Sequence, residues 1–370
     1  MAASLKRFFD RTVVSAIAKE IRAAHPAFPG AAFERQALAG LGRLELMDRG
    51  RHIAEALRAH LPEDPEHAIR ILTRSLGPDI PADGSPGMSP FRYLPHTVFV
   101  AEHGLDCFET SMLAQRELTR RFTAEFSIRA FIERHPERTL TQLRRWARDQ
   151  DPHVRRLVSE GTRPRLPWAP RLRAYQRDPS PVLALLELLK DDVSLYVRRS
   201  VANNLNDIGK DHPELLVEVC RRWMRGASAE RRWVVERALR SLVKQGHPGA
   251  LEVLGFGAPT RIELVSAQVQ PARVRIGQSV RVELVLANAG KGPARAVVDL
   301  AVGFVKQRGQ TSDKVFKLRA LELAPAERVS LGKSISLKQH TTRVHHPGEH
   351  RVTLLINGKR YPAGKFQLLR

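Results

Sequence analysis

The sequence of 370 residues has little cysteine, few aromatic side chains and no long apolar run. Its two cysteines, Cys107 and Cys220, are far apart and have no metal-ligand spacing around them, which excludes a disulfide framework and fits a reducing compartment. No stretch approaches the roughly 18 apolar residues of a membrane span, and the N-terminus lacks the apolar region of a signal peptide. We therefore expect a soluble cytoplasmic protein without a membrane partner.

Several catalytic motifs are also missing. The sequence contains no P-loop, no HExxH pattern, no zinc-type spacing of Cys and His, and no nucleophile elbow. Any catalysis is therefore expected to rest on carboxylates, electrostatics and positioning.

Basic residues are in large excess. Lys and Arg number 61 against 39 Asp and Glu, so that the net charge is +22 and the pI about 10.9. A pI above about 9 is typical of nucleic-acid binding, with an anionic membrane surface as the alternative. The excess is uneven, because residues 261–370 hold 20 Lys and Arg against 7 Asp and Glu, a net +13, which leaves +9 for residues 1–260.

One short phrase occurs twice. Residues 151–160, DPHVRRLVSE, are echoed by residues 194–203, SLYVRRSVAN, at an offset of 43 residues, and residues 233–239 give a looser third copy 38 residues further on. A period near 40 residues with helical apolar spacing is typical of stacked helix pairs of the HEAT or armadillo kind. The phrase predicts an all-α solenoid.

The apolar spacing predicts helices throughout the first two thirds of the chain. Pro and Gly at high density predict a loop over residues 77–87. The connection 162–171 is Pro-rich, Arg-rich and unusually long for a repeat of this kind, which favours a functional role. The expected helices span residues 5–23, 33–60, 65–76, 107–124, 126–134, 140–148, 153–161, 182–189, 195–208, 213–224 and 229–245.

After residues 255–259 the apolar period changes from 3.6 to 2, which predicts strands. Asn357-Gly358 predicts a tight hairpin turn. About seven short antiparallel strands in this segment predict an immunoglobulin-like β-sandwich. We expect two domains, a HEAT-like repeat domain at residues 1–257 and the sandwich at residues 261–370. The expected strands begin around Ile262 and continue at residues 280–286, 297–305, 314–318, 328–337, 350–356 and 365–369.

Two carboxylates are the first candidates for chemistry. Glu160 and Asp207 each lie next to a helix-ending glycine, where the negative end of the helix dipole disfavours an anion by roughly 0.3 to 1 kcal/mol. A carboxylate kept at an unfavourable end of a helix indicates a functional role, although a purely structural role remains an alternative. Asn203, the counterpart of Glu160 in the second copy, is four residues before Asp207, so both share one helix face.

The other candidates are an aromatic ring and several arginines. Trp168 could stack on a base or face a cation, or it could plug the solenoid core. The pairs Arg155/Arg156 and Arg198/Arg199 recur at equivalent places and predict a basic row, for which we favour phosphate contact over a merely solvated face.

The motifs SEGTRPRLPW at residues 159–168 and VANNLND at residues 201–207, with Leu94-Pro95-His96, resemble the AlkC branch of the DNA alkylation repair glycosylases, relatives of AlkD. The resemblance covers about residues 1–257, and some members of the family carry a C-terminal immunoglobulin-like domain. It implies hydrolysis of the N-glycosidic bond of cationic alkylated bases such as 3-methyladenine and 3-methylcytosine, without metal or cofactor.

By the family pattern, Asp207, Glu160 and Glu125 match the active-site carboxylates, and Trp168 matches an aromatic beside the lesion. Arg163 and Arg165 in the same motif join the basic row as expected DNA contacts. The expected partner is double-stranded DNA with alkylated bases, bound by a monomer at the nucleoid. Two alternatives remain, a non-catalytic HEAT-repeat scaffold and an architectural DNA-binding protein.

Overall fold

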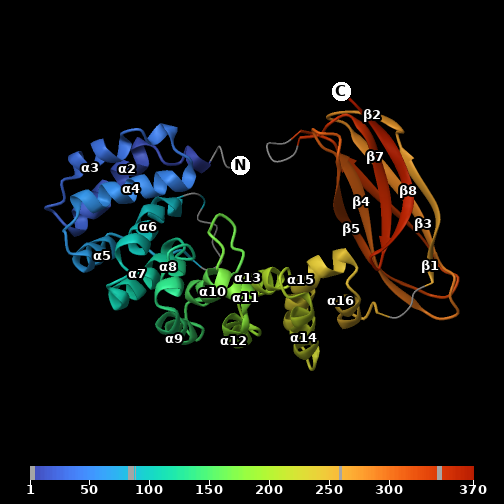
Figure 1. Cartoon of the computed structure of the whole chain (residues 1–370), viewed down its shortest axis with the longest axis horizontal. Coiled ribbons are helices and arrows are strands. Elements are labelled where there is room, and N and C mark those ends of the chain that lie inside the picture. Colours follow the sequence, from blue (N-terminus) through green and yellow to red (C-terminus); the bar gives the residue numbers. More distant parts are fainter. Residues whose placement is uncertain (1–4, 82–86, 88, 258–260, 340–343) are drawn as a thin grey trace. The chain divides into compact units, whose positions relative to one another are not determined.

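The computed structural model describes residues 5–81, 87, 89–257, 261–339 and 344–370. Helices come first along the chain and strands follow (Figure 1). The chain divides into two compact units, one of Met1–Asp211 with Ala229–Val234 and the other of His212–Ser228 with Val235–Arg370. No helix in the described ranges is long and apolar enough to cross a membrane. The described helices end before residues 257–261 and the strands begin after them, as the predicted domain boundary requires. The two compact units divide at other positions, so this boundary stays a prediction.

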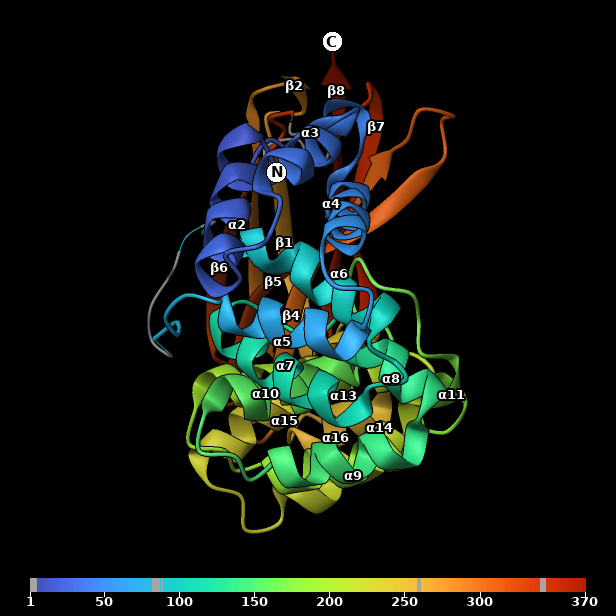
Figure 2. The ribbon, with the colours of Figure 1, turned by 90° about the vertical axis from the view of Figure 1, so that its left-hand side faces the viewer.

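The first unit is built from helices that follow one another in chain order. Figure 2 looks onto its amino-terminal end, where α2, α3 and α4 lie together. The described helices of this unit are α2 (Arg11–Ala24), α3 (Gly30–Leu38), η1 (Leu41–Arg43), α4 (Leu46–His60), α5 (Pro65–Arg74), η2 (Ser89–Tyr93), α6 (Leu94–His103), α7 (Phe108–Arg121), α8 (Ile128–Arg134), α9 (Pro136–Trp146), α10 (Pro152–Gly161), α11 (Arg173–Arg177), α12 (Ser180–Leu189) and α13 (Leu195–Ile208). Of the helices that follow, α14 (Pro213–Met224) and α16 (Pro248–Val253) belong to the second unit, and α15 (Ala229–Gln245) is divided between the two units.

The doubled phrase forms two helices that pack against each other, α10 and α13. Val154 and Val197, the equivalent valines of the two copies, are both fully buried. Asp151 caps α10 by accepting a hydrogen bond from the backbone N–H of His153, and Pro152 occupies the first turn, where its missing N–H has no cost. The repeat prediction is confirmed, and α13 has the predicted bounds.

Two predicted helices are wrong. The helix predicted at residues 5–23 is interrupted, because Asp10 has an extended backbone and caps a helix, α2, that begins only at Arg11. Residues 33–60 form two helices instead of one, because Gly40 takes a left-handed backbone conformation with φ of 75° and the chain then makes the short 3-10 turn η1. Glycine accepts this conformation without a steric penalty, so the apolar period resumes at Leu46 in a new direction. The predicted loop at 77–87 falls partly outside the described residues, which omit 82–86.

The second unit contains the sandwich. Its described strands form a sheet of three strands, β1-β3-β6, and a sheet of five, β2-β8-β7-β4-β5. The pairing is antiparallel except for the short β2, which the sequence did not indicate and which runs parallel to β8. The strands are β1 (Ile262–Gln270), β2 (Arg273–Arg275), β3 (Ser279–Asn288), β4 (Ala294–Val305), β5 (Thr311–Leu323), β6 (Arg328–Ser336), β7 (Gly348–Ile356) and β8 (Lys359–Leu369).

The two-residue turn between β7 and β8 confirms the predicted hairpin. Asn357 and Gly358 both have positive φ, 48° and 77°, as a type I′ turn requires. A side chain at Gly358 would also collide with the backbone of Gly246, since an added Cβ would lie 2.1 Å from the Cα of Gly246. Within this unit, backbone therefore meets backbone where the hairpin turn approaches the end of α15.

Candidate active site

A cavity of about 390 Å³ lies in the first unit, beside the loop that follows α10. Its walls combine apolar and aromatic side chains with two acidic and two basic ones. Small-ligand sites are usually concave and mostly apolar, with a few polar groups that fix orientation. The lining residues are Leu46, Met47, Ile80, Gly87, Pro90, Phe91, Leu94, Phe122, Thr123, Glu125, Phe126, Arg156, Glu160, Arg163, Leu166, Pro167 and Trp168.

Two of the predicted carboxylates meet at this cavity through Arg156. The Arg156 Nη1 is 2.5 Å from Glu125 Oε2, and its Nη2 is 3.6 Å from Glu160 Oε1. Thr123 Oγ1 donates a second hydrogen bond to the same Oε2 of Glu125, at 2.8 Å. Glu125 Oε1 thus has no hydrogen-bond partner within the described part of the chain, although Glu125 lines the cavity.

Arg163 joins the third carboxylate to this pair. Its Nη1 donates to Glu160 Oε1 at 2.6 Å, and its Nε and Nη2 approach Asp207 Oδ2 at 2.8 and 2.7 Å. Lys210 Nζ reaches the other oxygen of Asp207 at 2.7 Å. We call Glu125, Arg156, Glu160, Arg163, Asp207 and Lys210 the alternating charge row, since acid and base alternate along it and its formal charges cancel.

Burial strengthens the interactions in this row, except at its Lys210 end, where the lysine side chain is 45% exposed. The side chain of Asp207 is 2% exposed and that of Glu160 is 8% exposed. Burial acts to raise the pKa of Glu160, but Arg156 and Arg163 and the hydrogen bond from Ser200 outweigh it and hold this pKa below its usual value. For Arg156, burial opposes the charge, yet Glu125 and Glu160 raise its pKa further above the usual range. Both groups are therefore charged at neutral pH.

Trp168 stands at the rim of the cavity and is 60% exposed. This exposure overturns the alternative in which the ring plugs the solenoid core. Its backbone takes a left-handed conformation with φ of 65°, which costs a residue with a side chain roughly 1 to 2 kcal/mol. The surrounding loop must therefore hold it in place.

That loop is held by a residue that the sequence did not single out. Arg129 is buried in α8 and donates hydrogen bonds to the backbone carbonyls of Gly161 (3.1 Å), Arg163 (2.8 Å) and Pro170 (2.5 Å). Burial lowers the pKa of Arg129 to about 10, so it still carries its charge. An arginine on the apolar face of a short helix beside Ile128 was the available signal.

The predicted basic row does not form as a free surface. Arg155 makes a paired contact with Asp192 (2.6 and 3.0 Å), and Arg165 lies 2.5 to 2.9 Å from Asp211. Arg156 and Arg163 are engaged in the alternating charge row instead. These arginines are tied to acidic side chains of the same unit.

The second pair of arginines divides. Arg198 Nη1 donates to the carbonyl oxygens of Asp192 and Val193, at 2.6 and 2.9 Å, whereas Arg199 is exposed. A contact of any of these arginines with DNA stays a prediction.

His96, from the Leu94-Pro95-His96 motif, is buried in α6 and has no hydrogen bond on either ring nitrogen within the described residues. Burial, aided by Arg92, lowers its pKa from 6.5 to about 3. Below pH 6.5 the His96 imidazole therefore binds a proton in the unfolded chain but stays neutral in the folded protein. Stability should fall by up to ~1.4 kcal/mol per pH unit between these values.

We expect His96→Leu to make unfolding less dependent on pH between 7 and 5. The measurement is the melting temperature at both pH values, with His52→Leu, a partly exposed histidine, as the control. Equal pH dependence of His96→Leu and the unchanged protein would refute this explanation.

Comparisons with known proteins agree with these features. The family model "Uncharacterised protein YhaZ, C-terminal Ig-like domain" matches residues 263–370. The uncharacterized protein YhaZ of Bacillus subtilis (strain 168) is 35% identical over 367 residues, which cover 99% of both chains. The solved structure of Pseudomonas fluorescens AlkC, an alkylpurine DNA glycosylase bound to DNA containing an abasic site analog, is 37% identical with a TM-score of 0.91 and covers 99% of both chains.

Fold and site together define a HEAT-like repeat protein that carries a C-terminal immunoglobulin-like domain. The chain belongs to the AlkC family of DNA glycosylases. The resemblance inferred from residues 159–168 and 201–207 is thereby confirmed, and it extends beyond residue 257 to nearly the whole chain.

Proposed function

We propose that this protein is a DNA N-glycosylase of base excision repair that releases cationic alkylated bases, with 3-methyladenine and 3-methylcytosine as its substrates. It would act as a monomer on duplex DNA at the nucleoid. The observation that carries the proposal is the cavity beside Trp168, where aromatic side chains meet Glu125 and Glu160. The similarity to AlkC, bound to DNA containing an abasic site analog, supports the same reading.

The chemistry asks little of the protein beyond charge and position. An alkylated base of this kind already bears a positive charge, so it can leave the sugar without a general acid. The sugar then becomes an oxocarbenium-like cation, as in glycoside hydrolysis, and a water attacks it. The site must therefore stabilise positive charge and orient that water.

Glu125 is the carboxylate that remains available for the water, because its Oε1 has no partner in the described chain while it lines the cavity. Glu160 also lines the cavity, but both of its oxygens are occupied, by Arg163 and by Ser200 at 2.6 Å. Asp207 lies outside the lining and acts on the site through Arg163. In this proposal Asp207 and Glu160 set the electrostatic potential and Glu125 holds the water.

Trp168 would hold the cationic base by cation–π attraction, worth roughly 0.5 to 2 kcal/mol. We expect Trp168→Ala to slow base release about tenfold in single-turnover assays, and Trp168→Phe, which keeps a ring, to slow it less. Because the ring is 60% exposed, neither change should lower the melting temperature. Equal rates for the alanine and phenylalanine variants would remove the ring from the mechanism.

The sandwich is proposed as a second DNA-contacting part, supported by the net +13 of residues 261–370. A chain that ends at Gly257 should bind duplex DNA more weakly, and its affinity should depend less on salt, because fewer counterions are released. Fluorescence anisotropy at several salt concentrations measures this, and circular dichroism checks that the helices stay folded. An unchanged salt slope would show that the sandwich does not touch DNA.

One experiment separates catalysis from the two alternatives. Duplex DNA treated with a methylating agent is incubated with the protein, and released bases are identified by chromatography and mass spectrometry. Free 3-methyladenine or 3-methylcytosine is expected. Binding of DNA without release would favour an architectural protein, and absence of both would favour a scaffold.

A further inference from the structure

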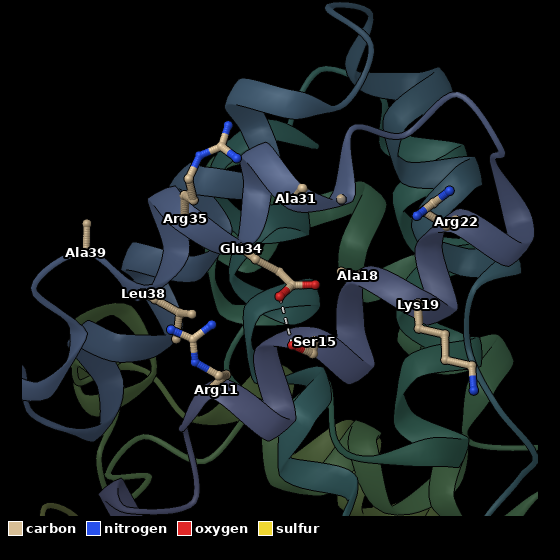
Figure 3. A pocket seen from close by; sticks show the side chains of 11 residues that line it. Arg11, Ser15, Ala18, Lys19, Arg22, Ala31, Glu34, Arg35, Leu38 and Ala39 are labelled. Atoms are coloured by element: carbon tan, nitrogen blue, oxygen red, sulfur yellow. Dashed lines mark hydrogen bonds between the residues drawn. The ribbon is translucent and has the colours of Figure 1, made fainter.

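A second cavity, of about 810 Å³, lies between α2 and α3 and is rich in cations (Figure 3). Along α2, Arg11, Ser15, Lys19 and Arg22 follow at intervals of four, four and three residues, so they share one face of the helix. On the other side α3 contributes Arg35. We call this feature the α2–α3 cleft.

The cations of the α2–α3 cleft are free to bind a ligand. Arg11, Lys19, Arg22 and Arg35 are all exposed, and none forms an ion pair within residues 5–81 or the other described ranges. The cleft's one carboxylate, Glu34, accepts a hydrogen bond from Ser15 at 2.8 Å. Figure 3 shows the four basic side chains around this pair. Four cations against one anion contrast with the alternating charge row, where the charges cancel.

The spacing of these cations suits an extended anion better than a small one. Arg11 and Arg22 are eleven residues apart, about 16 Å along a helix that rises 1.5 Å per residue. One DNA strand carries a phosphate every ~3.4 Å, so the face of α2 spans about five phosphates. A single phosphate or a free nucleotide could reach only part of this row.

The α2–α3 cleft lies one helix away from the candidate active site. Glu20, on the opposite face of α2 from the cleft, approaches Arg92 of η2 at 3.0 Å. Its neighbour Phe91 lines the cavity beside Trp168. A helix is about 10 to 12 Å across, so the thickness of α2, which separates the cleft from the face that carries Glu20, corresponds to roughly three or four nucleotides of one strand.

We propose that the α2–α3 cleft binds the phosphodiester backbone of duplex DNA beside the lesion, in a register set by the candidate active site. The inference rests on the proposed function for its choice of DNA as the partner. It moves part of the phosphate contact away from Arg155, Arg156, Arg163 and Arg165, whose charges are already neutralised, to the exposed cations of α2 and α3.

The test compares two variants that remove the same charge. Lys19→Ala/Arg22→Ala acts in the cleft, and Arg144→Ala/Arg145→Ala removes two exposed cations from α9 as a matched control. Binding of a labelled duplex of about 25 base pairs with a central abasic-site analogue is measured between 50 and 300 mM salt. The cleft variant should bind on the order of tenfold more weakly at 0.1 M salt, with a slope of log K against log salt reduced by about 1.8. The control should change neither quantity.

Shortened duplexes test the register. When fewer than about three nucleotides remain on one side of the abasic analogue, the unchanged protein should bind about as weakly as the cleft variant binds the full-length duplex. Shortening the duplex should not weaken binding by the cleft variant any further. Equal slopes for the cleft variant and the control would overturn the proposal. So would tight binding of inorganic phosphate or a nucleoside monophosphate that disappears in the cleft variant while its DNA slope stays unchanged.

Failure of this proposal can be told from failure of the proposed function. Salt slopes measured on undamaged duplex do not depend on catalysis, so they test the cleft even if no base is released. Conversely, the protein could release base while the salt slope of its DNA binding does not change in Lys19→Ala/Arg22→Ala. That result would support the glycosylase proposal and contradict the cleft proposal. Arg35→Glu, a charge reversal on α3, gives an independent second variant.

Discussion

Asp207→Asn protein is expected to bind undamaged duplex DNA with unchanged affinity and to release 3-methyladenine roughly 10²-fold more slowly. Asp207 pairs with Arg163 and Lys210, so its neutralisation leaves the alternating charge row with one excess positive charge. A unit charge some 7 Å from a developing cation acts with about 2 to 3 kcal/mol at an effective dielectric constant of 20. Single-turnover release from methylated duplex measures the loss.

Asp211→Asn is the matched control, because Asp211 also pairs with an arginine, Arg165, but belongs to neither the cavity nor the row. It should release base at the unchanged rate. If Asp207→Asn and Asp211→Asn behave alike, the carboxylate at 207 has no special electrostatic role.

Arg163→Gln should destabilise the protein by about 3 to 5 kcal/mol, the usual consequence of removing one partner from a buried ion pair. The arginine is 11% exposed in its side chain and touches both Glu160 and Asp207. Without it the two buried carboxylates face each other with less compensation. Thermal and chemical unfolding measure the loss.

The same variant should shift the pH dependence of base release. Burial raises the pKa of Glu160, and Arg156 and Arg163 together bring it below the usual 4.5. A depressed pKa contributes stability that is present above pH 4.5 and lost as pH falls through the folded value. Loss of Arg163 raises this pKa, so the acidic limb of the rate profile should move to higher pH.

Arg165→Gln provides the comparison two residues further along the same loop. Among the described residues, Arg165 forms an ion pair only with Asp211, and it is more exposed than Arg163, so its loss should cost less than about 1 kcal/mol and leave the pH profile in place. The double variant Arg163→Gln/Asp207→Asn should be more stable than the sum of the single losses predicts, because it removes both charges. Strict additivity would mean that the two side chains do not interact.

Local sequence rules predicted much of the fold. The bounds of α13, α14 and α15 follow from apolar spacing between Pro and Gly signals, and Asn357-Gly358 predicted its hairpin turn. The rules failed where a local choice depends on distant partners. The short β2 is a strand only because β8 offers it an edge, and its three residues carry too little pattern to be predicted.

For the site, the sequence singled out residues that the structure brings together, but it did not predict how they contact one another. Glu125, Glu160 and Trp168 do line one cavity. The arginines were expected to face DNA because the sequence shows their positive charge but does not show which acidic side chains pair with them in the fold. Asp192 and Asp211 lie 37 and 46 residues from the arginines they neutralise, and no periodicity relates them.

The left-handed backbone at Trp168 creates a conflict between the proposed activity and thermal stability. Glycine at this position would relieve the strain at φ of 65° and would give up little buried surface, since the ring is already 60% exposed. Selection for heat resistance alone would therefore favour a residue that abolishes the aromatic contact. Residue 168 should be checked first in any thermostabilised form of this protein, because glycine there would stabilise the fold but could not make the proposed aromatic contact with the base.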